Sequence, residues 1–350
     1  MENGNTEHEV EPHAVVQPLI AISMGDPAGV GPEISVKAMA NPDIYEISRP
    51  VLVGDRAVIE QAALISGLDV EIRSVSSPRE GRYRTGTIDL IDLQNIGLSG
   101  FTAGKVDAAC GKAAYEYIER AARLALHREA DAVVTAPISK EAIKQAGVPY
   151  FGHTEILGHL SGTDDPLTMF ETHALRVFFL TRHLSLADAI RSVTQKRVYE
   201  YILRCSDALK KLGVADPMLA VAGLNPHSGD GGLFGDEEIR CISPAVRDAK
   251  SNGVKVEGPV PADSVFALAL QGRFSAVLSL YHDQGHIATK TLDFERTISV
   301  TLGLPFLRTS PDHGTAFDIA GTGKAQERSM ESALSAAARY SPGYRSSWSL

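Results

Sequence analysis

Three histidines follow closely on the ends of predicted β-strands. His183 ends the run RVFFLTRH, His227 ends LAVAGLNPH and His282 ends AVLSLYH. In an open parallel sheet, ligands bind at the carboxyl ends of the strands, so three imidazoles placed there can meet at one point. Imidazole nitrogens bind Zn²⁺ or Co²⁺, and a three-histidine site with open positions is typical of catalysis. The alternative is three ordinary loop histidines that bond to backbone, and the spacing alone leaves both interpretations open.

Other reactive side chains accompany these histidines. The segment GHTE places His153 beside Thr154, followed by a carboxylate. Asp263 in PADS and Asp283 in YHDQGH could act as a base or accept a hydrogen bond from a ligating imidazole. Lone carboxylates of this kind are more often helix caps or surface groups, so the pattern makes them candidates only.

The net charge of the chain is negative, so an anionic substrate would need a few cations that lie close together. The 350 residues hold 34 Lys and Arg against 43 Asp and Glu, a net charge of −9. This excess argues against nucleic acid or an anionic membrane surface as a partner. Lys290 and Arg308, the cations nearest these segments in sequence, would suit a phosphate or a carboxylate, although each alone is by default a solvated residue.

Cysteine usage and hydropathy indicate a cytoplasmic protein. The three cysteines are far apart and form neither a disulfide framework nor a CxxC pair. No apolar stretch approaches the roughly 18–20 residues that a membrane span needs. We expect a loose tail over residues 1–16, which lack the features of a signal peptide.

Short β-branched runs alternate with helical patterns, which predicts an α/β fold with a parallel sheet and helical crossovers. Nine strands are predicted, at 19–24, 50–54, 69–75, 87–93, 131–136, 175–181, 218–224, 276–281 and 297–302. Nine helices are predicted, at 32–40, 57–67, 108–129, 140–146, 185–192, 196–212, 236–252, 263–272 and 327–340. So many strands favour two α/β lobes with a cleft between them.

The segment GDPAGVGPE at 25–33 places three glycines before a helix. It lacks the Lys-Ser/Thr ending of a phosphate-binding P-loop, and no GxGxxG follows a strand. The glycines could bring backbone close to a ligand, and a tight strand-to-helix turn explains them equally well.

Longer motifs resemble the 4-hydroxythreonine-4-phosphate dehydrogenase family. They are MGDPAGVGPE at 24–33, FGHTE at 151–155, GLNPHSGDGGLFGDEE at 223–238, PADSVF at 261–266, YHDQGH at 281–286, TLGLPFLRTS at 301–310 and DHGTAFDIAGTGKA at 312–325. The likeness runs from about residue 18 to 340. It implies a two-lobed α/β/α fold like that of isocitrate and isopropylmalate dehydrogenases, with the active site in the interdomain cleft.

The resemblance also implies domain limits and site residues. We expect a first lobe of 17–135 plus 306–350 and a second lobe of 136–305 that carries the metal and dimer contacts. One divalent ion (Zn, Mg, Co or Mn) would be held at the interface of a homodimer by the histidines that match the family's ligands: His183, His227 and His282. Substrate contacts match His153, Thr154, Lys290 and Arg308, and Lys290, Asp263 and Asp283 are the candidate catalytic groups.

The segment HGTAFDIAGTGKA is similar to the loop of isopropylmalate and isocitrate dehydrogenases that wraps the adenosine of the dinucleotide. By that likeness the residues that meet the cofactor are His313, Gly314, Thr315, Ala316 and Asp318. The Asp binds ribose hydroxyls in those enzymes and disfavours a 2′-phosphate, so the resemblance implies NAD rather than NADP.

One departure concerns the substrate. Members that make pyridoxal phosphate generally carry Asn where this chain has Ser299, and the flanking segments resemble a branch that oxidises 4-phospho-D-threonate or 4-phospho-D-erythronate. The resemblance therefore implies oxidation of the C3 hydroxyl of a small phosphorylated hydroxy acid, with Ser299 a further substrate contact, followed by decarboxylation to dihydroxyacetone phosphate. The alternatives are oxidation of 4-phosphohydroxy-L-threonine in pyridoxal phosphate synthesis and, more remotely, a non-catalytic ligand-binding relative.

Overall fold

The computed structural model describes residues 17–347, so the tail expected over 1–16 lies outside the described residues. Within them the strands form one twelve-stranded sheet. Its order across the sheet is β3 (Glu71–Ser74), β4 (Thr87–Asp92), β2 (Arg49–Gly54), β1 (Leu19–Ser23), β5 (Ala132–Thr135), β12 (Leu307–Pro311), β11 (Ile298–Leu302), β6 (Leu167–Thr172), β7 (Leu175–Phe179), β10 (Ala276–Ser279), β8 (Leu219–Ala222) and β9 (Val256–Val260).

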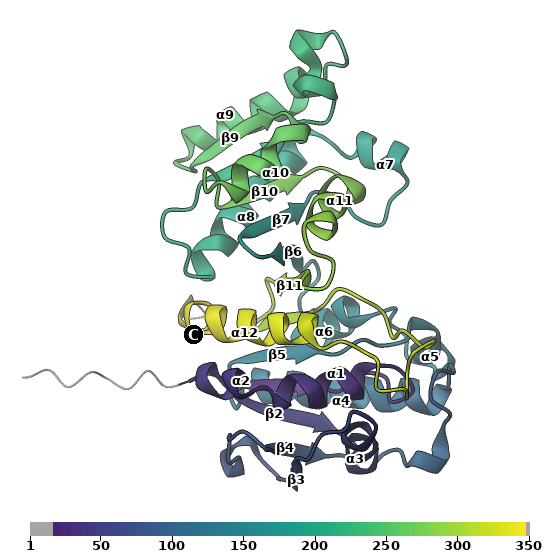
Figure 1. The fold of residues 1–350 in the computed structure, drawn as a ribbon. Helices are drawn as coiled ribbons and strands as arrows, with labels where there is room; N and C mark the ends of the chain where they lie inside the picture. The colour runs from purple at the N-terminus through teal and green to yellow at the C-terminus, as the bar shows by residue number, and fades with distance from the viewer. Residues whose placement is uncertain (1–16, 348–350) are drawn as a thin grey trace, which may run out of the picture.

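Helices cover both faces of this sheet (Figure 1). The α-helices are α1 (Gly31–Ala40), α2 (Pro42–Ile47), α3 (Arg56–Ile65), α4 (Ala108–Leu126), α5 (Lys140–Gln145), α6 (His153–Ser161), α7 (Leu186–Arg191), α8 (Gln195–Lys211), α9 (Ser243–Ser251), α10 (Ala262–Leu270), α11 (His282–Leu292) and α12 (Arg328–Ser347). Short turns of other helix types are η1 (Pro78–Glu80), η2 (Leu98–Gly100), η3 (Pro226–Gly232) and the π-helical η4 (Glu238–Ile242). None of the described helices is both long and apolar enough to span a membrane.

The structure has the two-lobed α/β form that the sequence predicts. One lobe contains β1 to β5 with α1 to α6 and α12, the other contains β6 to β10 with α7 to α11, and the central strands β11 and β12 join them (Figure 1). Pairing is antiparallel at β12–β11, β11–β6 and β6–β7 and parallel elsewhere. The lobe boundary between residues 135 and 136 stays a prediction. The helices α5 and α6, which follow this boundary, pack against α4.

Consecutive apolar residues explain why the strands lie in the interior. All five residues of β1 and all four of β5 are buried, as expected for strands covered on both faces. All nine predicted strands and all nine predicted helical segments are present. Three strands (β6, β9, β12) and three helices (α2, α6, α11) were not predicted. In β12 the reason is plain: LRTSP is mostly polar, yet every residue is buried at the centre of the sheet.

Candidate active site

Arg308 is a buried cation at the centre of the sheet. It lies on β12 opposite Thr301 of β11, and only 6% of its surface is exposed. Its guanidinium donates to Thr135 Oγ1 from Nε (3.0 Å) and Nη2 (2.7 Å) and to Thr301 Oγ1 from Nη1 (3.1 Å). No carboxylate oxygen of residues 17–347 lies within 4.0 Å of it, and burial lowers the pKa of Arg308 to about 10. A buried positive charge held only by hydroxyl groups could be neutralised by an anion.

His153 lies beside this cation, at the first position of α6. The residue is half-buried, but its Nε2 atom is fully buried and has no hydrogen-bond partner among the described residues. Burial holds the pKa of His153 well below its usual value, and the charges of Arg308 and Lys140 lower it further. The imidazole is therefore neutral, with one polar nitrogen available to a bound molecule. Thr154, also half-buried, follows it.

Lys290 projects from α11 and pairs with a residue that the sequence did not single out. Its Nζ lies 2.9 Å from Asp312 Oδ2 and 5.4 Å from the ring centre of Phe294. Burial raises the pKa of Asp312, although Lys290 acts against this rise. Ser299, buried on β11, lies two residues from Thr301 and so faces the same side of the sheet as Arg308.

Two of the predicted metal ligands lie close together. β7 and β8 both pair in parallel with β10, so the strands that precede the three histidines are neighbours with a common direction. The ring centres of His183 and His282 are 6.3 Å apart, near the upper limit for two imidazoles on one ion at about 2.1 Å from each nitrogen. Asp283 Oδ1 lies 2.6 Å from His282 Nδ1, which leaves Nε2 to face a ligand. Burial also lowers the pKa of His183, which favours the neutral form that binds metals.

His227 lies apart from this pair. It begins a run of six residues with positive φ, from His227 to Gly232, inside η3. This loop is anchored by Glu238, whose Oε1 accepts the backbone N–H groups of Leu224 and Asn225. No group of three His, Cys, Asp or Glu side chains in residues 17–347 lies close enough to hold a metal ion. The expectation that all three histidines meet at one point is therefore not met within a single chain.

The two candidate proton-relay carboxylates have different surroundings. Asp283 is exposed and bonded to His282 as described above. Asp263 is exposed in the first turn of α10, a helix that contacts η3 and the end of β10. The catalytic and substrate roles of these residues stay predictions.

The loop at 312–325 forms one wall of a pocket of about 420 Å³. Three of the five predicted cofactor residues line it, His313, Gly314 and Ala316, together with Val30 and Ile34 from the start of α1. Thr315 contributes its backbone instead: its carbonyl accepts the N–H of Val30 at 2.9 Å. Asp318 is exposed and does not line this pocket.

The glycine-rich segment at 25–33 holds that loop in place. Glu33, 2% exposed, accepts the backbone N–H groups of Gly321 at 2.6 Å and Gly323 at 2.9 Å. A Cβ atom at Gly29 would lie 2.9 Å from Thr315 Cβ, so the close approach requires glycine there. The segment is a tight turn that borders a pocket, and its close approach to a ligand stays a prediction.

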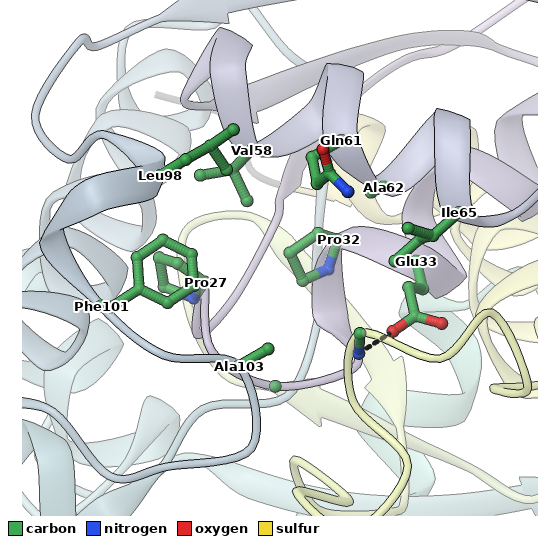
Figure 2. A pocket seen from close by; sticks show the side chains of 12 residues that line it. Pro27, Pro32, Glu33, Val58, Gln61, Ala62, Ile65, Leu98, Phe101 and Ala103 are labelled. Atoms are coloured by element: carbon green, nitrogen blue, oxygen red, sulfur yellow. Dashed lines mark hydrogen bonds between the residues drawn. The ribbon is translucent and has the colours of Figure 1, made fainter.

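A second pocket, of about 340 Å³, lies against the same two segments. Figure 2 shows Pro32 and Phe101 bordering it, the Gln61 amide directed into it, and the Glu33 carboxylate bonded to the backbone of the 312–325 loop. Most of its lining is apolar, and none of the predicted site residues belongs to it.

Two further cations adjoin the site and were missed in the sequence. Lys140 is the first residue of α5, and Arg182 directly precedes His183. Both lower the pKa of His183, and Arg182 also lowers that of Arg308, so their charges lie near these groups. The only sequence signal was position, since each follows closely on a predicted strand, as His183 does.

These observations define a class of protein: an α/β fold in which unpaired cations and histidines lie near the central strands of the sheet. The chain matches the family model "Pyridoxal phosphate biosynthetic protein PdxA" over residues 46–337, and it belongs to that family. This confirms the resemblance noted in the sequence.

Individual relatives agree with this assignment. The chain is 57% identical over 329 residues, covering 94% of this chain and 98% of the relative, to a Clostridium botulinum protein with the provisional name D-threonate 4-phosphate dehydrogenase. Two solved structures named 4-hydroxythreonine-4-phosphate dehydrogenase are similar: one from Klebsiella pneumoniae (40% identity, TM-score 0.86) and one from Burkholderia phymatum (45%, TM-score 0.83). Each covers 93% of this chain and 98% of its own.

Proposed function

We propose that this protein is a dehydrogenase that uses NAD and a divalent metal to oxidise the C3 hydroxyl of 4-phospho-D-threonate or 4-phospho-D-erythronate. The carboxylate of the resulting 3-keto acid leaves as CO₂, C2 takes up a proton, and the product is dihydroxyacetone phosphate. The observation that carries this proposal is Arg308: a buried guanidinium without a carboxylate partner in the described chain, beside the unpartnered nitrogen of His153. The name of the 57% identical relative supports the same substrate class.

The substrate-binding roles follow from these surroundings. Arg308 attracts an anionic group, and the hydroxyl of Ser299 lies on the same face of the sheet. Lys290 is oriented by Asp312 at 2.9 Å. The neutral imidazole of His153 and the hydroxyl of Thr154 orient the polar groups of the substrate without adding charge.

The donor set fits a divalent metal. His183 and His282 lie within reach of a common ion, and the Asp283 carboxylate at His282 Nδ1 is the kind of contact that orients a metal-binding imidazole. A metal held by these histidines would lower the pKa of a substrate hydroxyl. Because Asp283 is engaged with His282, Asp263 is the carboxylate left to accept the hydroxyl proton.

His227 would join the other histidines across a subunit interface. Exposed apolar side chains follow two of the three predicted ligands: Leu184 and Leu186 after His183, and Leu233 and Phe234 after His227. Such clusters are typical of surfaces that are covered in an assembly. We therefore propose a homodimer whose interface completes the metal site.

The pocket lined by His313, Gly314 and Ala316 would hold the adenosine part of NAD. Its volume of about 420 Å³ and its largely apolar lining suit a planar ring. Asp318 is exposed at this loop and would meet a ribose hydroxyl only at the pocket's rim.

A second substrate, 4-phosphohydroxy-L-threonine, is favoured by the names of the two solved structures. NAD reduction is measured with 4-phospho-D-threonate, 4-phospho-D-erythronate and 4-phosphohydroxy-L-threonine side by side, with added Mg²⁺, Co²⁺ or Zn²⁺. We expect the two hydroxy acids to be preferred and Ser299→Asn to shift the preference toward the amino substrate. A preference of the unaltered protein for the amino substrate would overturn the substrate assignment.

The metal assignment has its own control. His227→Ala should abolish turnover and lower the affinity for Co²⁺ or Zn²⁺, while the protein stays folded, because this loop is held by Glu238 rather than by the imidazole. Near-normal turnover of that variant would contradict the metal site.

A further inference from the structure

Two threonines, Thr135 and Thr301, form a clamp around the guanidinium of Arg308. β12 lies between β5 and β11 in the sheet. Thr301 of β11 is directly opposite Arg308, and Thr135 ends β5, two positions beyond Val133, which pairs with Arg308. Because side chains alternate between the faces of a sheet, the two threonines and the arginine lie on the same face. All three are shielded from water, with exposures of 0% (Thr135), 1% (Thr301) and 6% (Arg308).

The threonine clamp leaves part of the guanidinium free. Thr135 Oγ1 accepts hydrogen bonds from Nε at 3.0 Å and from Nη2 at 2.7 Å, and Thr301 Oγ1 accepts one from Nη1 at 3.1 Å. A guanidinium has five N–H groups, so one on Nη1 and one on Nη2 have no acceptor among the described residues. These two terminal nitrogens can bind two oxygens of one anion.

The threonine clamp also leaves the charge of Arg308 uncompensated. A buried arginine is usually paired with a carboxylate, which neutralises it. No carboxylate oxygen of residues 17–347 lies within 4.0 Å of the Arg308 guanidinium. Asp312, the carboxylate whose charge acts on Arg308, pairs with Lys290 Nζ at 2.9 Å, and the other charge that acts on Arg308 is the positive charge of Arg182. Hydroxyl groups therefore fix the position of this cation without cancelling its charge.

A third threonine provides a comparison on the same strand. Thr309 follows Arg308 on β12 and faces the other side of the sheet, where its Oγ1 donates to the carbonyl of Ala333 on α12 at 2.7 Å. Thr309 is 0% exposed, as Thr135 is. Its hydrogen bond joins the sheet to a helix and touches no charged group. Thr309 is therefore a matched control for a buried threonine that serves the fold.

We propose that Thr135 and Thr301 are positioning residues, which fix the Arg308 guanidinium without neutralising it and so direct its free terminal N–H groups to an anionic group of the substrate. This inference rests on the proposed function, in which Arg308 binds the substrate. Thr135 has the larger part, because it accepts two of the three hydrogen bonds. The geometry and the charge of the clamp can be altered separately.

Removing a hydroxyl tests the geometry. Thr135→Val keeps the shape of the side chain and removes two hydrogen bonds, so KM for 4-phospho-D-threonate should rise about tenfold with kcat within about threefold. Thr301→Val removes one hydrogen bond and should raise KM about threefold. Thr135→Ser keeps the hydroxyl and should rescue KM to within about twofold of the unaltered protein. Thr309→Val, the matched control, should lower stability toward urea and leave KM unchanged.

A carboxylate in the clamp tests the charge. Thr135→Asp keeps an acceptor for Nε and Nη2 but neutralises the guanidinium, so the protein should fold while KM rises at least about thirtyfold, more than in Thr135→Val. A purely structural role of Thr135 predicts the reverse order, since the aspartate restores the hydrogen bonds that the valine removes. A KM for Thr135→Asp close to that of the unaltered protein would therefore overturn the inference. Urea unfolding checks that each variant is folded.

Inorganic phosphate shows which anionic group of the substrate Arg308 meets. Its affinity is measured by calorimetry for the unaltered protein and for the Thr135 variants. If phosphate affinity falls as KM rises, Arg308 binds the phosphate group of the substrate. If KM rises and phosphate affinity is unchanged, Arg308 binds the carboxylate. Either result supports the threonine clamp, because KM responds in both.

The inference and the proposed function fail separately. If Arg308→Gln loses turnover while Thr135→Val and Thr301→Val keep the KM of the unaltered protein, Arg308 stands as a substrate contact and the positioning role is refuted. A rise in KM in Thr309→Val equal to that in Thr135→Val would also refute the positioning role. If Arg308→Gln turns over 4-phospho-D-threonate normally, the anion site of the proposed function is itself wrong.

Discussion

The loop at 312–325 and the site around Arg308 and His153 differ in how their polar groups are satisfied. In the loop at 312–325, backbone N–H groups are bonded to Glu33, and Lys37 Nζ donates to the carbonyls of Gly323 (2.7 Å) and Ala325 (2.6 Å). At the site around Arg308 and His153, no carboxylate oxygen of the described residues lies within 4.0 Å of the Arg308 guanidinium, and the Nε2 atom of His153 has no hydrogen-bond partner among them. The first region bonds its backbone groups within the protein, whereas the second leaves polar groups that a ligand would satisfy.

This difference predicts which polar groups serve the fold and which serve a ligand. A buried polar group that is fully bonded stabilises the fold, while one without a partner costs free energy until a ligand arrives. Substitutions in the loop should therefore lower stability first, and substitutions of Arg308 or His153 should lower substrate binding first. The predictions below test that contrast.

The largest effect is expected at Arg308. Arg308→Gln should lower kcat/KM for the phosphorylated substrate by at least about 10³-fold, about 4 kcal/mol, because the main buried charge for the anion is lost. The free energy of unfolding should rise or stay within about 1 kcal/mol, since a neutral amide costs less to bury than an unpaired guanidinium. Steady-state kinetics and urea unfolding measure both. A protein destabilised by several kcal/mol would show that Arg308 serves the fold.

The opposite pattern is expected at Glu33. Glu33→Ala removes the acceptors of two loop N–H groups and should lower the free energy of unfolding by about 2–3 kcal/mol. It should also raise KM for NAD while leaving the affinity for inorganic phosphate unchanged. Glu33→Gln keeps one acceptor oxygen, so its loss of stability should lie between that of Glu33→Ala and that of the unaltered protein. A loss of phosphate affinity equal to the loss for NAD would remove the distinction between the two regions.

A smaller effect is expected in the pH dependence of folding stability. The pKa of His153 is lowered in the folded protein, so the unfolded chain binds the extra proton as the pH falls below about 6.5, and folding stability is lost in that direction. The slope is at most about 1.4 kcal/mol per pH unit for this group. His153→Gln should therefore lose less stability than the unaltered protein between pH 7 and pH 6, measured by urea unfolding with chelator present. Equal losses would show that His153 is solvated.

The carboxyl group of Asp26 has the opposite effect on folding stability at lower pH. Burial raises the pKa of Asp26 to about 6, so its folded form holds a proton that the unfolded form releases, and stability increases as the pH falls from about 6 toward 4. The comparison for His153 is for this reason confined to pH 7 to 6, where Asp26 contributes less.

The sequence predicted the apolar framework better than the elements that carry the site. Strands such as β1 and β5 were predicted because every residue in them is buried and nearly all are apolar. The elements α6, α11 and β12 were not predicted, and they carry His153, Lys290 and Arg308. Residues that serve a ligand interrupt the hydrophobic period, so functional segments give weak structural signals.

Some site residues gave no local signal beyond their position in the chain. Arg182, Lys140 and Asp312 matter through neighbours that are distant in the chain, as Asp312 does through Lys290. The adjacency of β7, β10 and β8 was needed to see which histidines lie together and that His227 stays apart in one chain. These facts depend on strand order and loop path, which motifs do not encode.

The most direct test of the account is the ratio of kcat/KM for 4-phospho-D-threonate to kcat/KM for D-threonate, measured as NAD reduction with a saturating divalent metal. The account predicts a ratio of at least about 10³, because the unpaired cations are arranged for the phosphate group. A ratio near one would contradict it, since the site around Arg308 and His153 would then serve something other than the substrate.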